Sequence, residues 1–380
     1  MNAIWNLFVF GCLFLLTASP VAADGAAKLL YALDLQCFGY FSPVTDRDAH
    51  AFEFLNSPVV FLDRNSLAIS FLTLTNGAGA SSESVTAGTS AQFHTVIVDA
   101  ASGRISQRQS WGNAGNVIAI LPLTDVGFFV QAGDQVAILS NELQQLVSMK
   151  LTVPGDLLPR FAASPSGRSL FSFIDSYDDK NGWLTRFDLL DTSHLSAKQS
   201  MLTPGQRFAT VSDTQVVYSL AMTSGPLRLM VQNVDDSSET GDLFVPNGVT
   251  ARAIAESHCS MAAFLSDTTL AISGDCDSLF ITHAGEILHE LHARDYRFGT
   301  DIRPSHDGHR FALARSKGRI RSPQITNLEL CVYDLSRHKF VFIVPVSPVP
   351  HVKLGFALSP DGGLLAIQRD NQLQVWKLPK

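Results

Sequence analysis

Positively charged side chains recur just before several short apolar segments of this 380-residue chain. Four of them precede such segments by comparable distances: Arg160, Arg207, Arg303 and Lys353. Two more, Arg319 and Arg321, belong to the basic stretch between Arg315 and Arg321. Guanidinium groups bind carboxylates and phosphates through two parallel hydrogen bonds, so this pattern predicts an anion-binding site. The alternative is that these cations pair with nearby carboxylates or are simply solvated.

Two other groups of side chains have the types that metals prefer, but not the spacing. His289 and His292 are three residues apart, and on a strand such residues point to opposite faces. An acidic segment offers oxygen ligands for calcium without the spacing of an EF-hand loop; its polar residues are Asp175, Asp178, Asp179 and Asn181. We therefore expect neither a metal site nor a cofactor.

Motifs of common enzyme classes are missing from the sequence. No GxSxG motif is present, and there is no glycine-rich phosphate loop of the Walker or dinucleotide type. No catalytic residues are therefore predicted, and a binding protein is favoured over an enzyme.

The elements that must position the cations are short strands, because one phrase recurs seven times between Asp63 and Asp361. Each copy has apolar residues, a turn rich in Ser, Asp, Gly or Asn, and a run of β-branched, aromatic and leucine residues. The first apolar residues after the turns are Leu67, Phe128, Leu170, Val216, Leu270, Phe311 and Leu365. Their spacing suits units of four short strands, each of about 40–45 residues. We predict an all-β, single seven-bladed β-propeller over residues 24–380, with six or eight blades as the alternatives.

The last copy of the phrase carries a family resemblance. The segment FALSPDGGLLAIQRDNQLQVWKL, from Phe356 to Leu378, resembles one blade of the WD-repeat-like and YVTN-type β-propellers. The chain lacks the Gly-His and regular Trp-Asp of true WD repeats. The resemblance therefore implies the looser, mostly bacterial propellers, including those similar to quinoprotein dehydrogenase heavy chains, which share no set of catalytic residues.

The two ends of the chain predict how the last blade is completed. That blade runs out after its third strand at Leu378, whereas Lys28 to Leu35 is a strand without a blade of its own. We expect this N-terminal strand to complete the seventh blade, which would remove an open sheet edge.

Loop lengths favour one face of the propeller as the site. In a four-stranded blade, the connection from the second to the third strand emerges at the same end as the connection to the next blade. The longest connections of the first kind are Thr75–Ala91, Asp175–Gly182 and Ser316–Asn327. The recurring cations are expected at this end too, so this loop-rich face is the predicted binding face.

The N-terminus predicts export. Residues 4–17 are almost entirely apolar, and Pro20, Val21, Ala22 and Ala23 resemble a cleavage site, so residues 1–23 are predicted to be a signal peptide. The apolar run is short for a membrane span. We expect a periplasmic or secreted protein with no stable membrane insertion after cleavage; an uncleaved N-terminal anchor is the alternative.

Four cysteines would remain after cleavage, in a compartment that permits disulfides. Cys259 and Cys276 bracket one repeat and are the first choice for a pair. Cys37 and Cys331 would then pair by elimination. The alternative is that some of the four are buried free thiols.

The formal net charge of −7 argues against a general nucleic-acid-binding protein. These observations predict an exported binding module for a protein or a small anionic ligand. The alternatives are a propeller enzyme, either a lactonase-like hydrolase or a quinoprotein dehydrogenase-like subunit, and a purely structural envelope protein.

Overall fold

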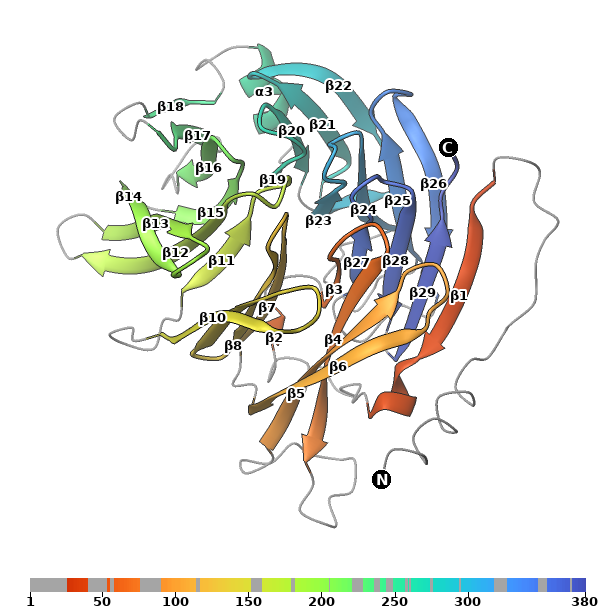
Figure 1. Cartoon of the computed structure of the whole chain (residues 1–380). Coiled ribbons are helices and arrows are strands. Elements are labelled where there is room, and N and C mark those ends of the chain that lie inside the picture. The colour runs from red at the N-terminus through yellow and green to blue at the C-terminus, as the bar shows by residue number, and fades with distance from the viewer. Residues whose placement is uncertain are drawn as a thin grey trace, which may run out of the picture. The chain divides into compact units, whose positions relative to one another are not determined.

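A computed structural model of the chain shows short β-strands in continuous succession (Figure 1). It describes residues 26–39, 53–54, 58–75, 90–113, 117–151, 159–178, 182–204, 206–220, 228–235, 240–243, 249–256, 259, 261–273, 276–293, 295–317, 327–347, 354–369 and 371–380.

The strands form seven successive sheets, so the predicted seven-bladed β-propeller is confirmed. The first two blades and the last belong to one compact unit. Blade one consists of β3 (Val59–Phe61), β4 (Ser66–Thr75), β5 (Ser90–Asp99) and β6 (Ile105–Asn113). Blade two consists of β7 (Val117–Leu123), β8 (Gly127–Ala132), β9 (Gln135–Leu139) and β10 (Gln145–Lys150), with β2 (Glu53–Phe54) added parallel to β7. Blade seven consists of β27 (Gly355–Leu358), β28 (Leu364–Arg369), β29 (Gln372–Lys377) and β1 (Lys28–Asp34).

Blades three to six belong to the second compact unit. Blade three consists of β11 (Arg160–Ala163), β12 (Leu170–Asp178), β13 (Gly182–Asp191) and β14 (Ser196–Pro204). Blade four consists of β15 (Gln206–Val211), β16 (Gln215–Leu220), β17 (Arg228–Asn233) and β18 (Thr240–Asp242). Blade five consists of β19 (Met261–Phe264), β20 (Thr269–Ser273), β21 (Ser278–His283) and β22 (Glu286–His292). Blade six consists of β23 (Arg297–Pro304), β24 (Arg310–Lys317), β25 (Asn327–Asp334) and β26 (Lys339–Pro345).

We call the four strands of each blade a to d in chain order from β3 onward, so that β1 is strand d of blade seven. The a–b and c–d turns lie at one end of a blade, its turn end. The b–c connection and the connections to neighbouring blades lie at the other end, its loop end. This division follows from antiparallel pairing within each sheet.

The second strand of every blade is built from the repeated apolar phrase. All seven residues that mark the phrase lie in strand b and are at most 2% exposed: Leu67, Phe128, Leu170, Val216, Leu270, Phe311 and Leu365. Successive residues of strand b, which point to opposite faces of the sheet, are both buried, as in β8, where all six residues are buried. Near-continuous apolar runs are typical of strands that lack a solvent face.

The turn before strand b owes its form to a serine and an aspartate. In blade seven, Ser359 donates its hydroxyl to Asp361 at 2.7 Å and accepts from the Leu364 backbone N–H at 2.8 Å. In blade six, Ser305 donates to Asp307 at 2.6 Å and accepts from the Arg310 N–H at 3.1 Å. These bonds satisfy backbone groups that the strand ladder leaves unpaired.

Glycine follows the aspartate because the backbone there is left-handed. Gly308 has φ +69°, and a Cβ on it would lie 2.9 Å from the carbonyl oxygen of Leu265, in the equivalent turn of blade five. Asp307 and Gly308 are therefore turn residues, as their types predict.

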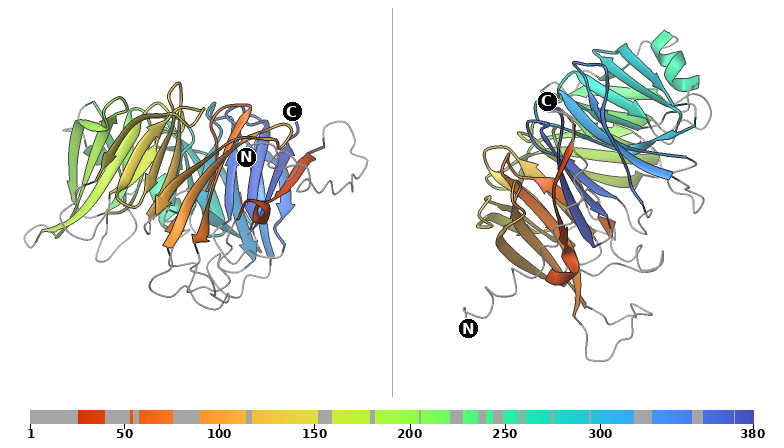
Figure 2. Two further views of the ribbon diagram at one scale, coloured as in Figure 1. Left: turned by 60° about the horizontal axis from the view of Figure 1, so that its bottom comes forward. Right: turned by 90° about the vertical axis from the view of Figure 1, so that its right-hand side faces the viewer.

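The N-terminal strand completes the last blade, as predicted. β1 pairs antiparallel with β29, from Lys28 opposite Lys377 to Asp34 opposite Gln372. Figures 1 and 2 show this red strand beside the blue C-terminal strands. Next to it, η2 (Leu35–Phe38) is a short 3-10 helix that ends at Gly39.

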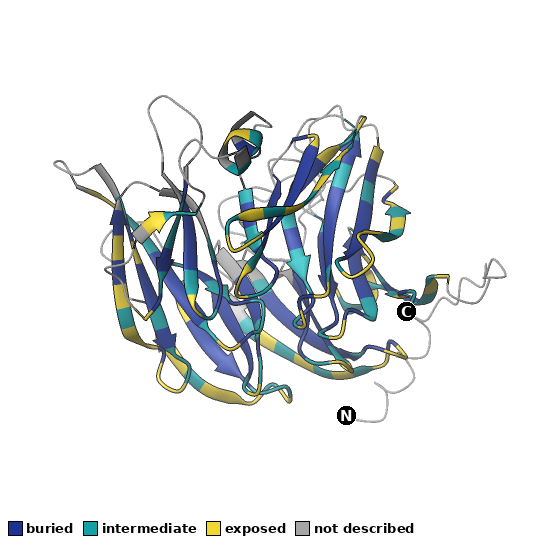
Figure 3. Cartoon of the chain, turned by 90° about the horizontal axis from the view of Figure 1, so that it is seen from above, coloured by how far each residue is buried: buried dark blue, intermediate teal, exposed yellow. Residues whose placement is uncertain are grey.

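Burial is greatest in the middle strands of a blade and least in its outer strand, where exposed residues form yellow bands (Figure 3). β8 is buried throughout, whereas β22 alternates between exposed and half-buried residues. A strand d has only one face against a neighbouring blade, and this accounts for the alternation.

Two features depart from the sequence-based expectation. The segment Asp175–Gly182 is largely strand rather than loop, because β12 runs to Asp178 and pairs with β13 from Gly182. The segment before blade five contains α3 (Val249–Glu256), a helix that buries Ile254 beside Phe264 and Cys259. Within the described part of the chain, no helix is long and apolar enough to cross a membrane.

Candidate functional site

Charged and aromatic side chains cluster at the loop end of blade six. Arg315 on β24 forms an ion pair with Glu329 on β25, with both Nε and Nη2 at 2.8 Å from Oε2. The hydroxyl of Tyr296, just before β23, donates to Oε1 of the same carboxylate at 3.1 Å. Glu329 thus neutralises Arg315 and fixes it in one position.

The ring of Tyr296 also accommodates a second cation. The Arg315 guanidinium carbon lies 4.6 Å from the ring centroid, and the Lys317 ammonium lies 5.3 Å from it. Among the described residues, no carboxylate forms an ion pair with Lys317. This group therefore has one uncompensated positive charge, held on an aromatic face.

The surroundings raise the pKa of two weakly acidic groups of blade six, the Tyr296 hydroxyl and the Cys331 thiol. Removal from water, with the Glu329 hydrogen bond and charge, raises the pKa of Tyr296. Burial raises the pKa of the Cys331 thiol to about 12. At neutral pH neither group adds a negative charge beside Lys317.

Arg160 lies at the loop end of blade three and is already paired. Its Nη2 donates to Asp175 at 2.6 Å, and its guanidinium carbon lies 5.0 Å from the ring centroid of Phe173. Thr185 donates to the other oxygen of Asp175 at 2.5 Å. Arg160 thus pairs with a nearby carboxylate, which was the alternative to an anion site. Both oxygens of Asp175 accept hydrogen bonds from protein groups.

Arg303 on β23 is held more loosely. Its Nη2 lies 3.7 Å from Asp301, beyond hydrogen-bond distance, and its Nε is buried without a hydrogen-bond partner in the described part of the chain. Arg207 lies on β15, where only the main chain is described. Lys353, Arg319 and Arg321 lie outside the described residues.

The three cations on described strands do not share one strand position. Relative to the serine that begins the a–b turn, Arg160 lies four residues before Ser164, Arg207 five before Ser212, and Arg303 two before Ser305. The sequence comparison counted residues from each cation to the first apolar residue of strand b. That count includes the a–b turn, which is shorter in blade four than in blades three and six, so it concealed the difference in position. The anion site can therefore be argued only for individual positions.

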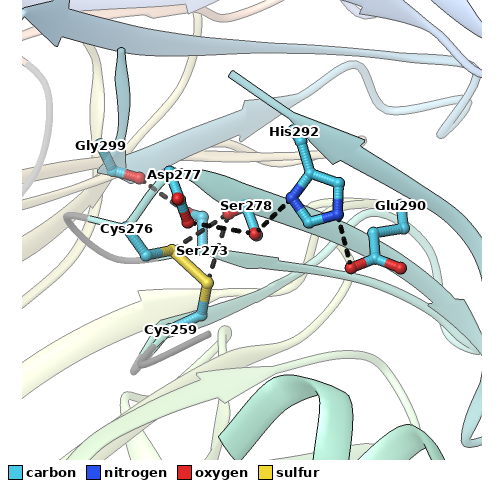
Figure 4. Close-up of a disulfide and its surroundings, with 8 residues drawn as sticks. All are labelled: Cys259, Ser273, Cys276, Asp277, Ser278, Glu290, His292 and Gly299. Atoms are coloured by element: carbon cyan, nitrogen blue, oxygen red, sulfur yellow. Dashed lines mark hydrogen bonds and ion pairs between the residues drawn. A yellow bond between two sulfur atoms is a disulfide. The ribbon is translucent and has the colours of Figure 1, made fainter. Parts of the chain in front are cut away.

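A disulfide lies at the loop end of blade five (Figure 4). Cys259 and Cys276 are bonded, with their Cα atoms 5.4 Å apart, which is the first-choice pair from the sequence. The Phe298 N–H donates to the Cys276 carbonyl at 2.8 Å, and Ser273 donates to the Gly299 carbonyl at 2.7 Å. The loop ends of blades five and six are thus joined by backbone contacts next to the disulfide.

The second cysteine pair is not formed. Cys331 is a buried free cysteine, in the middle of β25 and within the core of blade six. Cys37 lies exposed in η2 and is not its partner. The prediction that Cys331 pairs with Cys37 was wrong because Cys331 occupies an apolar core position of its strand, as free cysteines often do.

The two histidines of β22 point to opposite faces, as strand alternation requires. His292 pairs with Glu290 at 3.0 Å through Nε2 and with the Ser278 hydroxyl at 3.0 Å through Nδ1 (Figure 4). His289 instead contacts His338 of blade six, with ring centroids 3.8 Å apart. Among the described residues, no three His, Cys, Asp or Glu side chains converge on one point as a metal site would require.

Sequence reasoning missed Tyr296, Glu329 and the His289–His338 contact. Glu329 lies fourteen residues after Arg315, and only the pairing of β24 with β25 brings the two together. The one signal in the sequence that could have pointed to Glu329 is the alternation of polar and apolar residues at the start of β25.

Comparison with known proteins shows the fold and nothing more specific. No protein-family model matches the chain, and no curated protein matches it. A chain in the crystal structure of a mitotic checkpoint complex aligns with 96% of this chain and 100% of its own length, at 15% identity and a TM-score of 0.51. This likeness supports the β-propeller fold that the seven sheets form. As many as 801 chains of solved structures match it, so the fold alone cannot specify a function.

Proposed function

We propose that this chain is an exported β-propeller interaction module whose loop end of blade six binds an acidic segment of a partner protein or a small anionic ligand. The observation that carries the proposal is the Lys317 ammonium, which has no carboxylate partner among the described residues and rests on the Tyr296 ring. In the sequence, Arg319 and Arg321 follow it directly. Export and the kinship with YVTN-type propellers rest on the sequence alone.

The surrounding contacts suit an interaction surface. Arg315, Glu329 and Tyr296 hold one another rigidly, so an incoming anion would meet a preorganised group and would lose little affinity to side-chain ordering. The similar chain named above belongs to a multi-protein complex, which is consistent with a binding role.

The test measures binding of an acidic probe. A fluorescent polyglutamate peptide should bind the protein at low salt, and binding should weaken as salt rises because the contact is electrostatic. The triple substitution Lys317→Glu, Arg319→Glu and Arg321→Glu should weaken binding by at least about tenfold, which corresponds to about 1.4 kcal/mol.

Arg160→Ala is the matched control. It removes a cation from another loop end, but one that Asp175 already neutralises, so binding of the peptide should be unchanged. Equal affinity of the triple variant and the parent protein would refute the proposal. Equal loss in the control and the triple variant would show that the loss is not specific to blade six, which would also refute it.

A further inference from the structure

The connection that follows β20 of blade five lies next to the segment that carries Tyr296. The Cys276 carbonyl accepts the Phe298 N–H at 2.8 Å. The carbonyl of the next residue, Asp277, accepts the Ala293 N–H at 2.9 Å. Two successive carbonyls of blade five therefore hold the segment on both sides of Tyr296.

Ser273 provides a third anchor for this segment. Its hydroxyl, buried at the end of β20, donates to the Gly299 carbonyl at 2.7 Å (Figure 4). The Tyr296 N–H donates in turn to the Ala293 carbonyl at 3.1 Å, which closes a turn in front of β23. The backbone around Tyr296 is thus attached to blade five, although its side chain belongs to the charged group of blade six.

The start of β23 has few attachments to its own blade. Only Arg297 and Phe298 pair with β24 before the register shifts, and pairing resumes at Ile302. An irregularity of this kind leaves residues without ladder partners and disrupts the sheet locally. The position of the segment therefore depends strongly on its anchors in blade five.

The anchored segment orders the binding site. The Tyr296 ring lies 5.3 Å from the Lys317 ammonium and 4.6 Å from the Arg315 guanidinium carbon. Phe298 adds a second contact, because its ring stacks on Phe340 with centroids 6.4 Å apart, and the Phe340 ring lies 5.6 Å from the same guanidinium carbon. Displacement of the segment would remove the aromatic surface on which both cations rest.

The disulfide fixes the connection that provides the anchors. In the described part of the chain, Cys276 belongs to no strand and forms only an isolated bridge, with Phe298. Its bond to Cys259 attaches it to the core of blade five, where Cys259 lies with Ile254 of α3. Without this bond, the connection that anchors the Tyr296 segment would lose its covalent attachment to that core.

We propose that the binding site of blade six is fully ordered only when Cys259 and Cys276 are joined, so that disulfide formation converts the chain from a weak into a strong binder of acidic segments. This inference rests on the proposed function. A chain in a reducing compartment would hold Lys317 poorly, and an oxidising compartment would complete the site.

The chemical step is thiol–disulfide exchange with an oxidant of the disulfide class, such as oxidised glutathione. One cysteine attacks the oxidant as a thiolate, forms a mixed disulfide and releases one thiol. The second cysteine then attacks the mixed disulfide, which forms the Cys259–Cys276 bond and releases the second thiol. The two cysteines lose two electrons and two protons, and the oxidant gains both. Because Cys259 is 2% and Cys276 3% exposed, the exchange takes place before the blade closes around them.

The experiment compares the double variant Cys259→Ser, Cys276→Ser with the parent protein refolded in oxidised glutathione. The fluorescent polyglutamate peptide should bind the variant at least about fivefold more weakly, because binding then has to order Lys317 and Tyr296. Hydrogen exchange should be faster at the amides of Tyr296 and Phe298 in the variant. The parent protein refolded in dithiothreitol should behave like the variant in both measurements.

Gly308→Ala is the matched control for lost stability, because it strains the turn end of blade six, away from the disulfide and the Tyr296 segment. It should leave the affinity for the peptide unchanged; a loss equal to that of the double variant would overturn the proposal. Ser273→Ala keeps the disulfide and removes one anchor, so it should also weaken binding. If the double variant does not fold, unchanged affinity of Ser273→Ala overturns the proposal.

The outcomes separate this inference from the proposed function. Equal affinity of the folded double variant and the parent protein overturns the inference and leaves the proposed function standing. An effect of dithiothreitol that persists in the double variant also overturns it, because that effect would come from another cysteine. A parent protein that does not bind the peptide refutes the proposed function; unchanged hydrogen exchange at Tyr296 and Phe298 would then overturn the role of the disulfide as well.

Discussion

At the scale of single residues, the fold depends on side chains that satisfy backbone groups in tight turns. Ser305 and Asp307 in blade six repeat the bonds of Ser359 and Asp361 in blade seven. Burial alone would raise the pKa of Asp361, but bonds from Ser359 and Gly363 and the charge of Arg64 hold it below its usual value. These carboxylates are therefore structural groups and are not available as ligands.

Two glycines provide a matched test of turn geometry. Gly308→Ala should lower the free energy of unfolding by at least about 1–2 kcal/mol, because alanine disfavours its left-handed φ and the new Cβ would meet the Leu265 carbonyl at 2.9 Å. Gly241→Ala on β18 meets no atom within 4 Å, so its effect should stay within about 1 kcal/mol. Urea denaturation of both variants measures the difference. Similar midpoints would contradict the steric argument.

At the scale of elements, the repeated phrase was sufficient to predict each strand b but not the contacts between elements. Strand b is buried on both faces, and its apolar run is visible in the sequence. The pairing of Arg160 with Asp175 could not be foreseen, because Asp175 was assigned to a loop and lies on the extended β12. The Cys259–Cys276 pair was predictable because both residues bracket one blade, whereas Cys331 lies inside a strand.

The disulfide is expected to stabilise blade five more than the others. It closes a loop with a sequence separation of 17, for which the chain-entropy model gives about 3 kcal/mol. The double variant Cys259→Ser, Cys276→Ser should unfold at lower urea concentration. It should also lose amide protection in β19 and β21 before it does so in β12. Cys331→Ser is the control for removing a thiol without a disulfide. Uniform loss of protection in all blades would argue against a local role.

At the scale of the whole molecule, seven blades in succession could be predicted because each repeats one pattern of burial. Contacts between neighbouring blades could not be predicted, because they depend on how one sheet packs against the next, which no single repeat encodes. The His289–His338 contact and the bond from Ser166 to Asp213, at 2.6 Å between the turns of blades three and four, are examples. The candidate site was predicted only as the loop-rich face, and Lys317 belongs to a basic stretch that the sequence does show.

The free energy of unfolding of the whole protein should be nearly constant over a middle range of pH. Titratable groups removed from water set the acid and alkaline limits of this range. Burial, followed by the charge of Arg108, lowers the pKa of His94, and burial lowers that of His306 against the opposing charge of Asp307. The unfolded chain, in which a histidine has a pKa of about 6.5, then binds more protons than the folded one, so stability should fall as pH drops below about 6.5. On the alkaline side, burial raises the pKa of Cys331 to about 12, so the unfolded chain loses its thiol proton first and stability should fall above about pH 8.5.

Thermal melting across this pH range tests both limits of the plateau. His306→Gln should flatten the decline on the acid side, and Cys331→Ala should flatten it on the alkaline side. Each variant should have a lower plateau, because the packing of a half-buried histidine or of a buried cysteine is lost. His309→Gln, in the same turn but exposed, should leave both slopes unchanged. An acid slope that persists unaltered in His306→Gln would mean that other groups, such as Asp334 and Asp361 near their carboxylate range, carry the pH dependence instead.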